Sequence, residues 1–270
     1  MSSYYQGIGN EQRRYIEAVD AAADLPRCDS CGKSELDGIK LTECADCKSV
    51  QHCSDTCQNQ HRPRHEAECK ERAAELRNEM LFKQPECTHL GDCPICCLPL
   101  PLDPPKSSLY PCCSKVICNG CAFADELRQK RENMQRTCPF CRHPLPTTKE
   151  EANKIRMKRV AGNDPVAMRE MGVKHYDEGD YDGALKYWTK AAELGSAHAH
   201  YGLSLLYMQG HGVEKDEKKE VYHMEEAAIQ GNPNARHNLG AYEVMNDRDE
   251  RAVKHGSSLP ALAMINRCKR

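Results

Sequence analysis

Aromatic residues are scarce in this chain of 270 residues: they make up 6% of it, with a single tryptophan, whereas charged residues make up 29%. So few large apolar side chains exclude one large hydrophobic core, and the length favours two domains or one domain with smaller modules. No apolar run approaches the ~18 residues that cross a bilayer, so we expect no membrane segment. The N-terminal residues lack the basic stretch and apolar run of a secretory signal.

Neither sign of charge dominates the chain, and no catalytic motif stands out. The 38 basic residues nearly balance the 40 acidic ones, so composition gives no reason to expect binding to nucleic acid or to an anionic membrane. A phosphate-binding loop, a nucleophile elbow and an H-E-x-x-H pair are absent from the sequence. We expect a cytoplasmic or nuclear protein.

Cysteine, by contrast, is abundant. Most of the 18 cysteines stand in closely spaced pairs, and in a chain without a secretory signal such pairs indicate metal ligands rather than disulfides. Two thiolates three positions apart can both reach one zinc ion at about 2.3 Å. Four pairs are enough for two tetrahedral ions, so two cysteine-rich modules together predict four structural zinc ions.

The first module contains eight potential ligands in four pairs, Cys28/Cys31, Cys44/Cys47, Cys53/Cys57 and His65/Cys69. The spacing of the last two pairs places both ligands on one face of a helix. Such a short segment buries too little apolar surface to fold alone, and a structural zinc contributes on the order of 10–16 kcal/mol, so metal binding and folding should be one event. His52 and His61 fall outside the ligand register, and we expect both on the surface.

The ligand order over residues 28–69 resembles that of the MYND zinc finger. The resemblance implies two interleaved sites, formed by Cys28, Cys31, Cys53 and Cys57 and by Cys44, Cys47, His65 and Cys69. It also implies binding of short proline-containing peptides, for which Gln58 matches a family residue that contacts the peptide. Arg62 stands where the family has a tryptophan.

The second module, residues 93–142, has three C-x2-C pairs and a fourth pair, Cys112-Cys113, between the first and the second. It resembles an all-cysteine RING finger, which implies a cross-brace of two sites, Cys93, Cys96, Cys118 and Cys121 and then Cys112, Cys113, Cys138 and Cys141. Adjacent ligands depart from the family's C-x-H spacing. Cys97 is the alternative ligand, although we expect it to be a buried bystander. The proline-rich insert 98–105 predicts a surface loop.

Three further residues gain a role from the RING resemblance. In ubiquitin ligases of this family, Ile95 and Pro139 match positions that form the groove for a ubiquitin-conjugating enzyme, and Arg142 matches the cation that contacts the bound ubiquitin. All three have a structural alternative, because such residues also pack well in a zinc knuckle. The groove tryptophan that active members often carry is absent, since Trp188 lies outside the finger.

The segments around the two modules carry weaker signals. We expect a leader at 1–26, a solvated helical spacer at 70–92 and a linker at 143–163 that turns into a helix. Cys87 and His89 in the spacer are interpreted as loop residues, and the basic cluster of the linker as a solvated helix face.

Cysteine disappears after the linker, and a repeat begins at residue 164. Ala191-Ala-Glu-Leu-Gly195 recurs 36 residues later as Ala227-Ala-Ile-Gln-Gly231. The small residues would allow paired helices to approach closely, and the two glycines are typical of helix ends. The loop 207–219 resembles that of Sel-like repeats, which are relatives of tetratricopeptide repeats, and the repeat region spans 164–255. In the atypical tail 256–270 the segment 261–265 is a makeshift cap or part of a shortened array, and Cys268 has no assigned role.

Together these features predict small zinc-stapled α+β modules, the MYND and RING cross-braces, followed by an all-α helical-repeat solenoid. Two functions remain open. The first is a non-enzymatic adaptor that docks protein partners on the MYND, RING and repeat surfaces. The second is a RING-type E3 ubiquitin-protein ligase that recruits a conjugating enzyme through residues 93–142 and substrates through the other regions. Full zinc loading would shift the formal charge from −2 to about −9, which disfavours nucleic acid as a partner.

Overall fold

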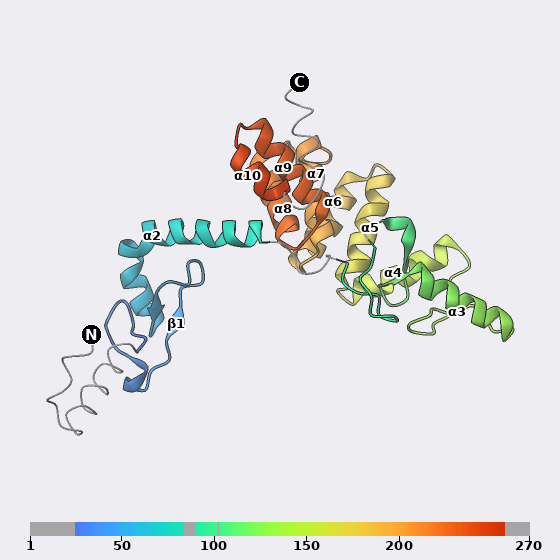
Figure 1. Cartoon of the computed structure of the whole chain (residues 1–270), viewed down its shortest axis with the longest axis horizontal. Coiled ribbons are helices and arrows are strands. Elements are labelled where there is room, and N and C mark those ends of the chain that lie inside the picture. The colour runs from blue at the N-terminus through green and yellow to red at the C-terminus, as the bar shows by residue number, and fades with distance from the viewer. Residues whose placement is uncertain (1–24, 84–89, 102, 257–270) are drawn as a thin grey trace, which may run out of the picture. The chain divides into compact units, whose positions relative to one another are not determined.

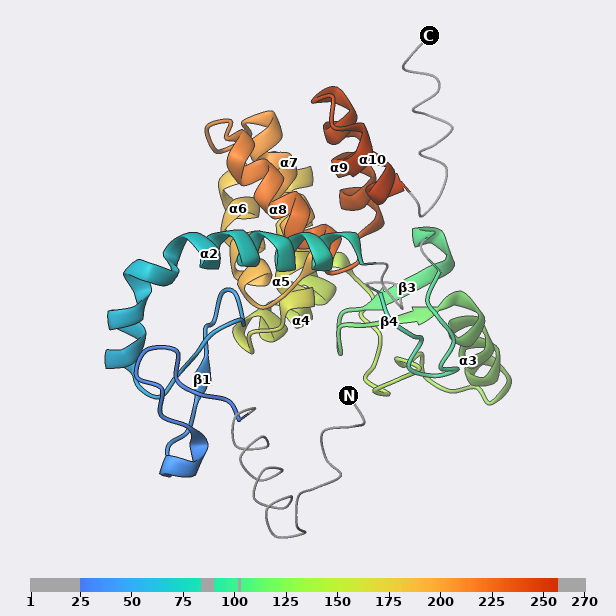
Figure 2. The same cartoon turned by 60° about the vertical axis from the view of Figure 1, so that its left-hand side comes forward.

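The computed structural model describes residues 25–83, 90–101 and 103–256. Contacts divide the chain into two units, Met1–Met80 and Leu81–Arg270. Figures 1 and 2 show short strands and helices in the cysteine-rich parts and a run of paired helices, α5 to α10, toward the C-terminus. The expectations for the leader, for Cys87 and His89, and for the tail after residue 256 lie outside the described residues. None of the helices within the described ranges is both long enough and apolar enough to cross a bilayer.

The first unit is built on one hairpin and one helix. A short 3-10 helix, η1 (Glu35–Asp37), precedes strand β1 (Thr42–Glu43), which pairs antiparallel with β2 (Gln51–His52). Helix α2 (Asp55–Phe82) follows directly. The buried side chains of this unit are mostly thiols and imidazoles rather than aliphatic groups. An interior of that composition has little hydrophobic stabilisation, which agrees with the expectation that metal binding and folding are coupled.

Helix α2 is a single helix of 28 residues that begins beside the ligand Cys53 and includes most of the expected spacer. Pro63 lies inside it, where the missing N–H and the ring disturb a helix, and both views show the helix turning along its length. The interpretation as a solvated spacer is wrong at its end, because Leu81 is only 1% exposed. Leu81 belongs to the second unit, in which it packs among repeat side chains.

The second cysteine module has the same kind of architecture. A short 3-10 helix, η2 (Pro104–Lys106), leads into β3 (Ser107–Tyr110), which pairs antiparallel with β4 (Lys115–Cys118), and helix α3 (Asn119–Arg131) follows. Its small core is formed by Cys93, Leu100 and Ile117. The burial of Leu100 corrects the prediction that the whole insert 98–105 is a surface loop.

The repeat region consists of helix pairs, introduced by α4 (Lys149–Ala161). The helices after it are α5 (Pro165–Asp177), α6 (Tyr181–Glu193), α7 (Ala197–Gln209), α8 (Glu217–Ile229), α9 (Pro233–Met245) and α10 (Asp249–Gly256). Polar residues cap the N-termini of α5 to α9 with side-chain hydrogen bonds, and they are Asp164, Asp180, Ser196, Asp216 and Asn232. Gly195 and Gly231 follow α6 and α8 at φ of 82° and 87°, so both act as helix stops as expected.

Small residues bring the first repeat helices together around Trp188. This side chain is 5% exposed, packs with Ala184, Leu203 and their neighbours, and donates its indole N–H to the Arg169 carbonyl at 3.2 Å. A Cβ atom added to Gly172 would lie 2.3 Å from the indole ring, and one added to Gly202 would lie 2.7 Å from it. Glycine at these positions is therefore what leaves room for the indole ring.

A second core lies around helices α8 and α9. Met224, Ala227, Ala228, Ala235 and Leu239 are buried there together with Leu81. The guanidinium of Arg236, which is 5% exposed, donates to the carbonyls of Lys83 and Ala228, both at 3.2 Å. Leu81 thus contributes to a core whose other members lie more than 140 positions later, a contact that no local pattern could indicate.

Candidate metal centres and partner-binding surfaces

Four groups of cysteine and histidine side chains come together in the described residues. In each group the potential ligand atoms all lie within 4.8 Å of one another. The members are those that the two resemblances imply: Cys28, Cys31, Cys53 and Cys57; Cys44, Cys47, His65 and Cys69; Cys93, Cys96, Cys118 and Cys121; and Cys112, Cys113, Cys138 and Cys141. Cys97 is in none of these groups.

Each group takes two of its ligands from one tight turn. In every such turn the residue four positions after the first cysteine has a φ between 56° and 73°, and its N–H donates to the carbonyl of that cysteine at 2.8–3.1 Å. The residues in this position are Gly32, Lys48, Cys97 and Arg142. The expectation that Cys97 is a buried bystander is therefore wrong, because this residue occupies the exposed left-handed position of its turn.

The remaining ligands come from helices, from the second hairpin and from the bend between β2 and α2. Cys53 lies in that bend, before α2 begins at Asp55, so the prediction that Cys53 and Cys57 share one helix face is wrong for Cys53. Cys57, His65 and Cys69 lie on α2, and the last two are one turn apart on the same face, as their spacing predicts. Cys118 ends β4 and Cys121 lies in the first turn of α3. Cys112 and Cys113 stand in the turn between β3 and β4, so two adjacent residues both reach the fourth group.

The spacing of the sulfur atoms fits zinc and does not fit disulfides. Six Sγ–Sγ distances within the groups are 3.4–3.8 Å. A disulfide bond would bring two sulfurs to about 2.05 Å, whereas tetrahedral ligands at about 2.3 Å from zinc are separated by about 3.8 Å. Cys47 Sγ lies 3.1 Å from His65 Nε2, close enough for both atoms to bind the same ion. The donor set of each group, thiolates with at most one imidazole, is also the set that zinc prefers.

The fold itself shifts the pKa values of two of these thiols in opposite directions. Backbone N–H groups of Cys47 and Asp46 lower the pKa of the Cys44 thiol to about 6, against the effect of burial. Burial and the neighbouring sulfur of Cys44 raise the pKa of Cys69 to about 12. One thiol of the group therefore ionises easily while another resists ionisation beside it. A divalent cation would remove this conflict, because it stabilises all the thiolates at once.

A groove of about 560 Å³ runs beside the second metal group of the first finger. Gln58 and Arg62 on α2 line it, together with Pro63, His65 and Cys69. The groove thus includes the family-matched Gln58 and also Arg62, which replaces the family's tryptophan.

His52 is also part of this groove, and the expectation that it lies on the surface is wrong. It is 5% exposed, and its Nε2 lies 3.1 Å from Nδ1 of His61, which in turn stacks on the ligand His65. Burial, and to a smaller degree the positive charge of His61, lower the pKa of His52. The alternation of strand β2 could have indicated that His52 faces inward, since the neighbouring Gln51 is the more exposed residue of the strand.

The three residues matched to ubiquitin ligases have different environments. Ile95 is 42% exposed. Pro139 is buried and lines a cavity of about 350 Å³ beside Phe123 of α3, and Ile95 is not part of that lining. Arg142 pairs with Asp125 of α3 at 2.9 Å, and Asp125 also binds Arg128. The guanidinium of Arg142 therefore joins its zinc turn to the helix of the finger.

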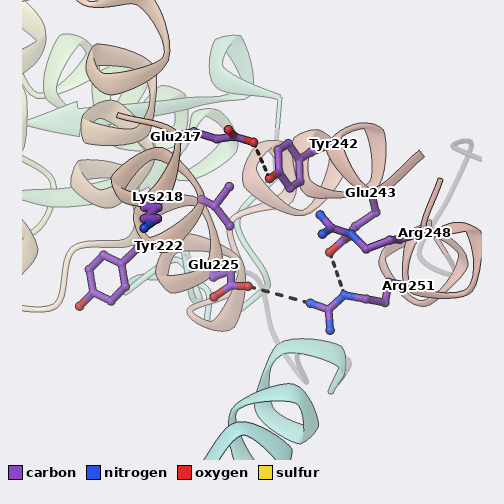
Figure 3. A pocket seen from close by; sticks show the side chains of 9 residues that line it. Glu217, Lys218, Tyr222, Glu225, Tyr242, Glu243, Arg248 and Arg251 are labelled. Carbon is purple, nitrogen blue, oxygen red and sulfur yellow. Dashed lines mark hydrogen bonds and ion pairs between the residues drawn. The ribbon is translucent and has the colours of Figure 1, made fainter. Parts of the chain in front are cut away.

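The repeat region has its own surface pocket, of about 500 Å³, between α8, α9 and α10. Figure 3 shows Arg251 between Glu225 and Glu243, at 4.0 Å and 2.9 Å, and Tyr242 donating to Glu217 at 2.8 Å. Glu243 is 3% exposed and also binds Arg248. No local sequence pattern indicates these residues, because they come from α8, α9, α10 and the turn before α10. The two arginines pair with Glu225 and Glu243, and the three acidic and three basic side chains of the lining give the pocket no net charge.

Comparisons with known proteins identify two of the three regions. Residues 28–69 match the MYND finger, and residues 165–196 and 197–232 match the Sel1 repeat. A stretch of 60 residues is 43% identical to "Putative beta-lactamase HcpC" of Helicobacter pylori strain J99, covering 22% of this chain and 21% of that protein. The protein of the same name from strain 26695 is 41% identical over 56 residues, which cover 21% of this chain and 19% of that protein. The chain spans about a fifth of the length of these curated relatives.

Among solved structures, a Sel1 repeat protein from Oxalobacter formigenes is similar to 41% of this chain. The identity is 28%, the TM-score is 0.38, and the matched part covers 49% of that chain. The MYND and Sel-like resemblances are confirmed by the family matches, and the RING resemblance of residues 93–142 stays a prediction. The chain therefore combines a MYND finger with Sel1 repeats.

Proposed function

We propose that this chain is a zinc-binding adaptor that holds protein partners on its two fingers and its helical repeats. The observation that carries the proposal is the geometry of the four ligand groups, whose sulfurs have the spacing of a zinc tetrahedron. MYND fingers and Sel1 repeats are generally modules of protein–protein interaction, and both are present here. The groove at Gln58 and the pocket beside Arg251 are the surfaces available for partners.

The zinc ions proposed here have a structural role. Each of the four groups offers four protein ligands, which complete a tetrahedron and leave no position for a reacting water. The ions would replace the hydrophobic core that the fingers lack, and the ordered turns and helices would then present the partner surfaces. Activity as an adaptor therefore depends on metal loading.

Native mass spectrometry of the purified full-length chain tests the metal assignment, and four zinc ions are expected. Two neighbouring cysteines provide a matched pair of variants. Cys96→Ser should lower the count to three, because Cys96 belongs to a ligand group, whereas Cys97→Ser should leave four, because Cys97 belongs to none. Equal counts for the two variants, or recovery of the sulfurs as disulfides, would contradict the assignment.

Partner binding is tested by affinity purification of the same chain from cells, with one variant for each region. Cys44→Ser disables a site of the first finger and Cys138→Ser a site of the second, and each should lose a distinct set of bound proteins. If the wild type retains no more protein than a chain stripped of zinc with a chelator, the adaptor proposal fails.

A RING-type ubiquitin ligase is the second candidate, favoured by the architecture of residues 93–142. The two ligand groups interleave along the chain, and a hairpin and a helix lie between the ligand pairs. Ile95 is exposed as a contact for a conjugating enzyme must be, whereas Pro139 is buried and Arg142 is held by Asp125. Ubiquitin-chain formation with a panel of conjugating enzymes, lost in Ile95→Ala at unchanged zinc content, would support this candidate. Inactivity with the whole panel would favour the adaptor alone.

A further inference from the structure

The groove of the first finger has the length of an extended peptide. The α2 residues that line it run from Gln58 to Ala73. At about 1.5 Å per residue this stretch is at most about 22 Å long, the length of about seven residues of extended chain. On the opposite side the groove is lined by Asp46 and by His52 of strand β2.

Four charged side chains line this groove, and two of them form an ion pair with each other. Lys70 binds Glu66 at 2.6 Å, so these two residues neutralise each other. The side chains of Arg62 and Asp46 form no hydrogen bond and no direct ion pair within the described ranges. Lys70, and to a smaller degree the more distant charge of Arg62, lower the pKa of Glu66. The groove therefore presents one guanidinium and one carboxylate that have no direct ion-pair partner in the described residues.

The Asp46 carboxylate lies on the side of the metal group. Asp46 stands between the ligands Cys44 and Cys47, and its N–H points at the Cys44 sulfur. Three thiolates and one imidazole around Zn²⁺ carry a net charge of about −1, which adds to that of Asp46. A negatively charged partner group would be repelled at this side and attracted at Arg62. The guanidinium of arginine also has the donor geometry that binds a carboxylate through two hydrogen bonds.

We propose that this groove binds an extended peptide that bears an acidic residue, with the carboxylate placed on Arg62. The inference rests on the proposed function of the first finger as a peptide-binding module and goes beyond it by stating which peptides are selected. Arginine here exchanges the flat apolar surface of the family's tryptophan for a charge, so the groove recognises an ion pair where its relatives recognise a stacked ring.

Fluorescence polarisation with the zinc-loaded full-length chain tests this selection. The probes are two labelled pools of seven-residue peptides with a central proline, one with a single glutamate at each of the flanking positions in turn and one with glutamine instead. An exposed ion pair contributes up to about 1 kcal/mol, so the wild type should bind the glutamate pool about fivefold more tightly. Arg62→Gln should abolish this difference, and Arg62→Glu should reverse it.

Arg64→Gln is the matched control, because Arg64 lies two residues away on α2, is exposed and does not line the groove. It should keep the preference for glutamate. Equal affinity of the wild type for both pools would overturn the charge selection while leaving the finger a peptide-binding module. If both the wild type and Arg62→Trp have full zinc content and neither protein binds either pool, the proposed peptide function is overturned as well as this inference.

Discussion

Replacing Gly172 by alanine should destabilise the first repeat, although alanine is normally the better residue in a helix. The new Cβ would lie 2.3 Å from two atoms of the Trp188 ring, which is far inside van der Waals contact. Gly172 is buried in α5 and the indole is enclosed by Ala184 and Leu203, so the ring has little room to move away. The clash must therefore be relieved by shifting the ring or the helix.

The size of the effect follows from three contributions. Overpacking of a core typically costs about 1–3 kcal/mol, with a middle value of about 2 kcal/mol. Moving the indole also breaks or weakens its hydrogen bond to the Arg169 carbonyl, which contributes about 1 kcal/mol to stability. Replacing a glycine inside a helix by alanine stabilises the helix by up to about 1 kcal/mol, which offsets part of this cost. The free energy of unfolding should therefore fall by about 2 kcal/mol.

The assay uses the one tryptophan of the chain as a local probe. Since Trp188 lies in this core, its fluorescence during urea unfolding reports on the first repeat rather than on the fingers. Gly240→Ala in α9 is the matched control, because a Cβ there meets its nearest neighbour at an ordinary 3.5 Å. That variant should be unchanged or slightly more stable. If Gly172→Ala were as stable as Gly240→Ala, the close approach of helix and indole would be refuted.

Three further changes test other parts of the structure. Leu81→Ala should lower the free energy of unfolding of the repeats by about 2–5 kcal/mol, because it leaves a cavity at a core side chain that is 1% exposed. Cys97→Gly should raise the resistance of the second finger to chelator-induced unfolding slightly, because a residue at φ 56° is less strained as glycine. Stability measured by calorimetry should be lost as pH falls from 6.5 toward 4, because burial lowers the pKa of His223 and of His255 to about 4 while the unfolded chain takes up protons near 6.5.

Each of these predictions has a control within the chain. Met80→Ala, at an exposed neighbour of Leu81, should leave the repeats unaffected, and an equal loss from both variants would contradict the burial of Leu81. Lys48→Gly should act on the first finger as Cys97→Gly acts on the second, since both residues hold the same place in a zinc turn. His255→Leu should flatten part of the acid-side slope, and an unchanged slope would show that this imidazole is not responsible.

Ligand chemistry was largely predictable from the sequence, because the spacing of a cysteine pair decides locally whether two sulfurs can reach one ion. The C-x2-C turns and the i, i+4 ligands of α2 need no information from elsewhere in the chain. The helix stops at Gly195 and Gly231 and the matches to the MYND finger and the Sel1 repeat follow from equally local patterns.

What only the tertiary structure decided concerns contacts between residues far apart in the chain. It buries Leu81 among repeat residues, places His52 inside the first finger and pairs Arg142 with Asp125. Whether a charged or apolar side chain is free for a partner depends on which neighbours the fold brings to it. Local spacing encodes the ligands of each site, whereas burial and ion pairing depend on packing, which is why the first was determined by sequence alone and the second was not.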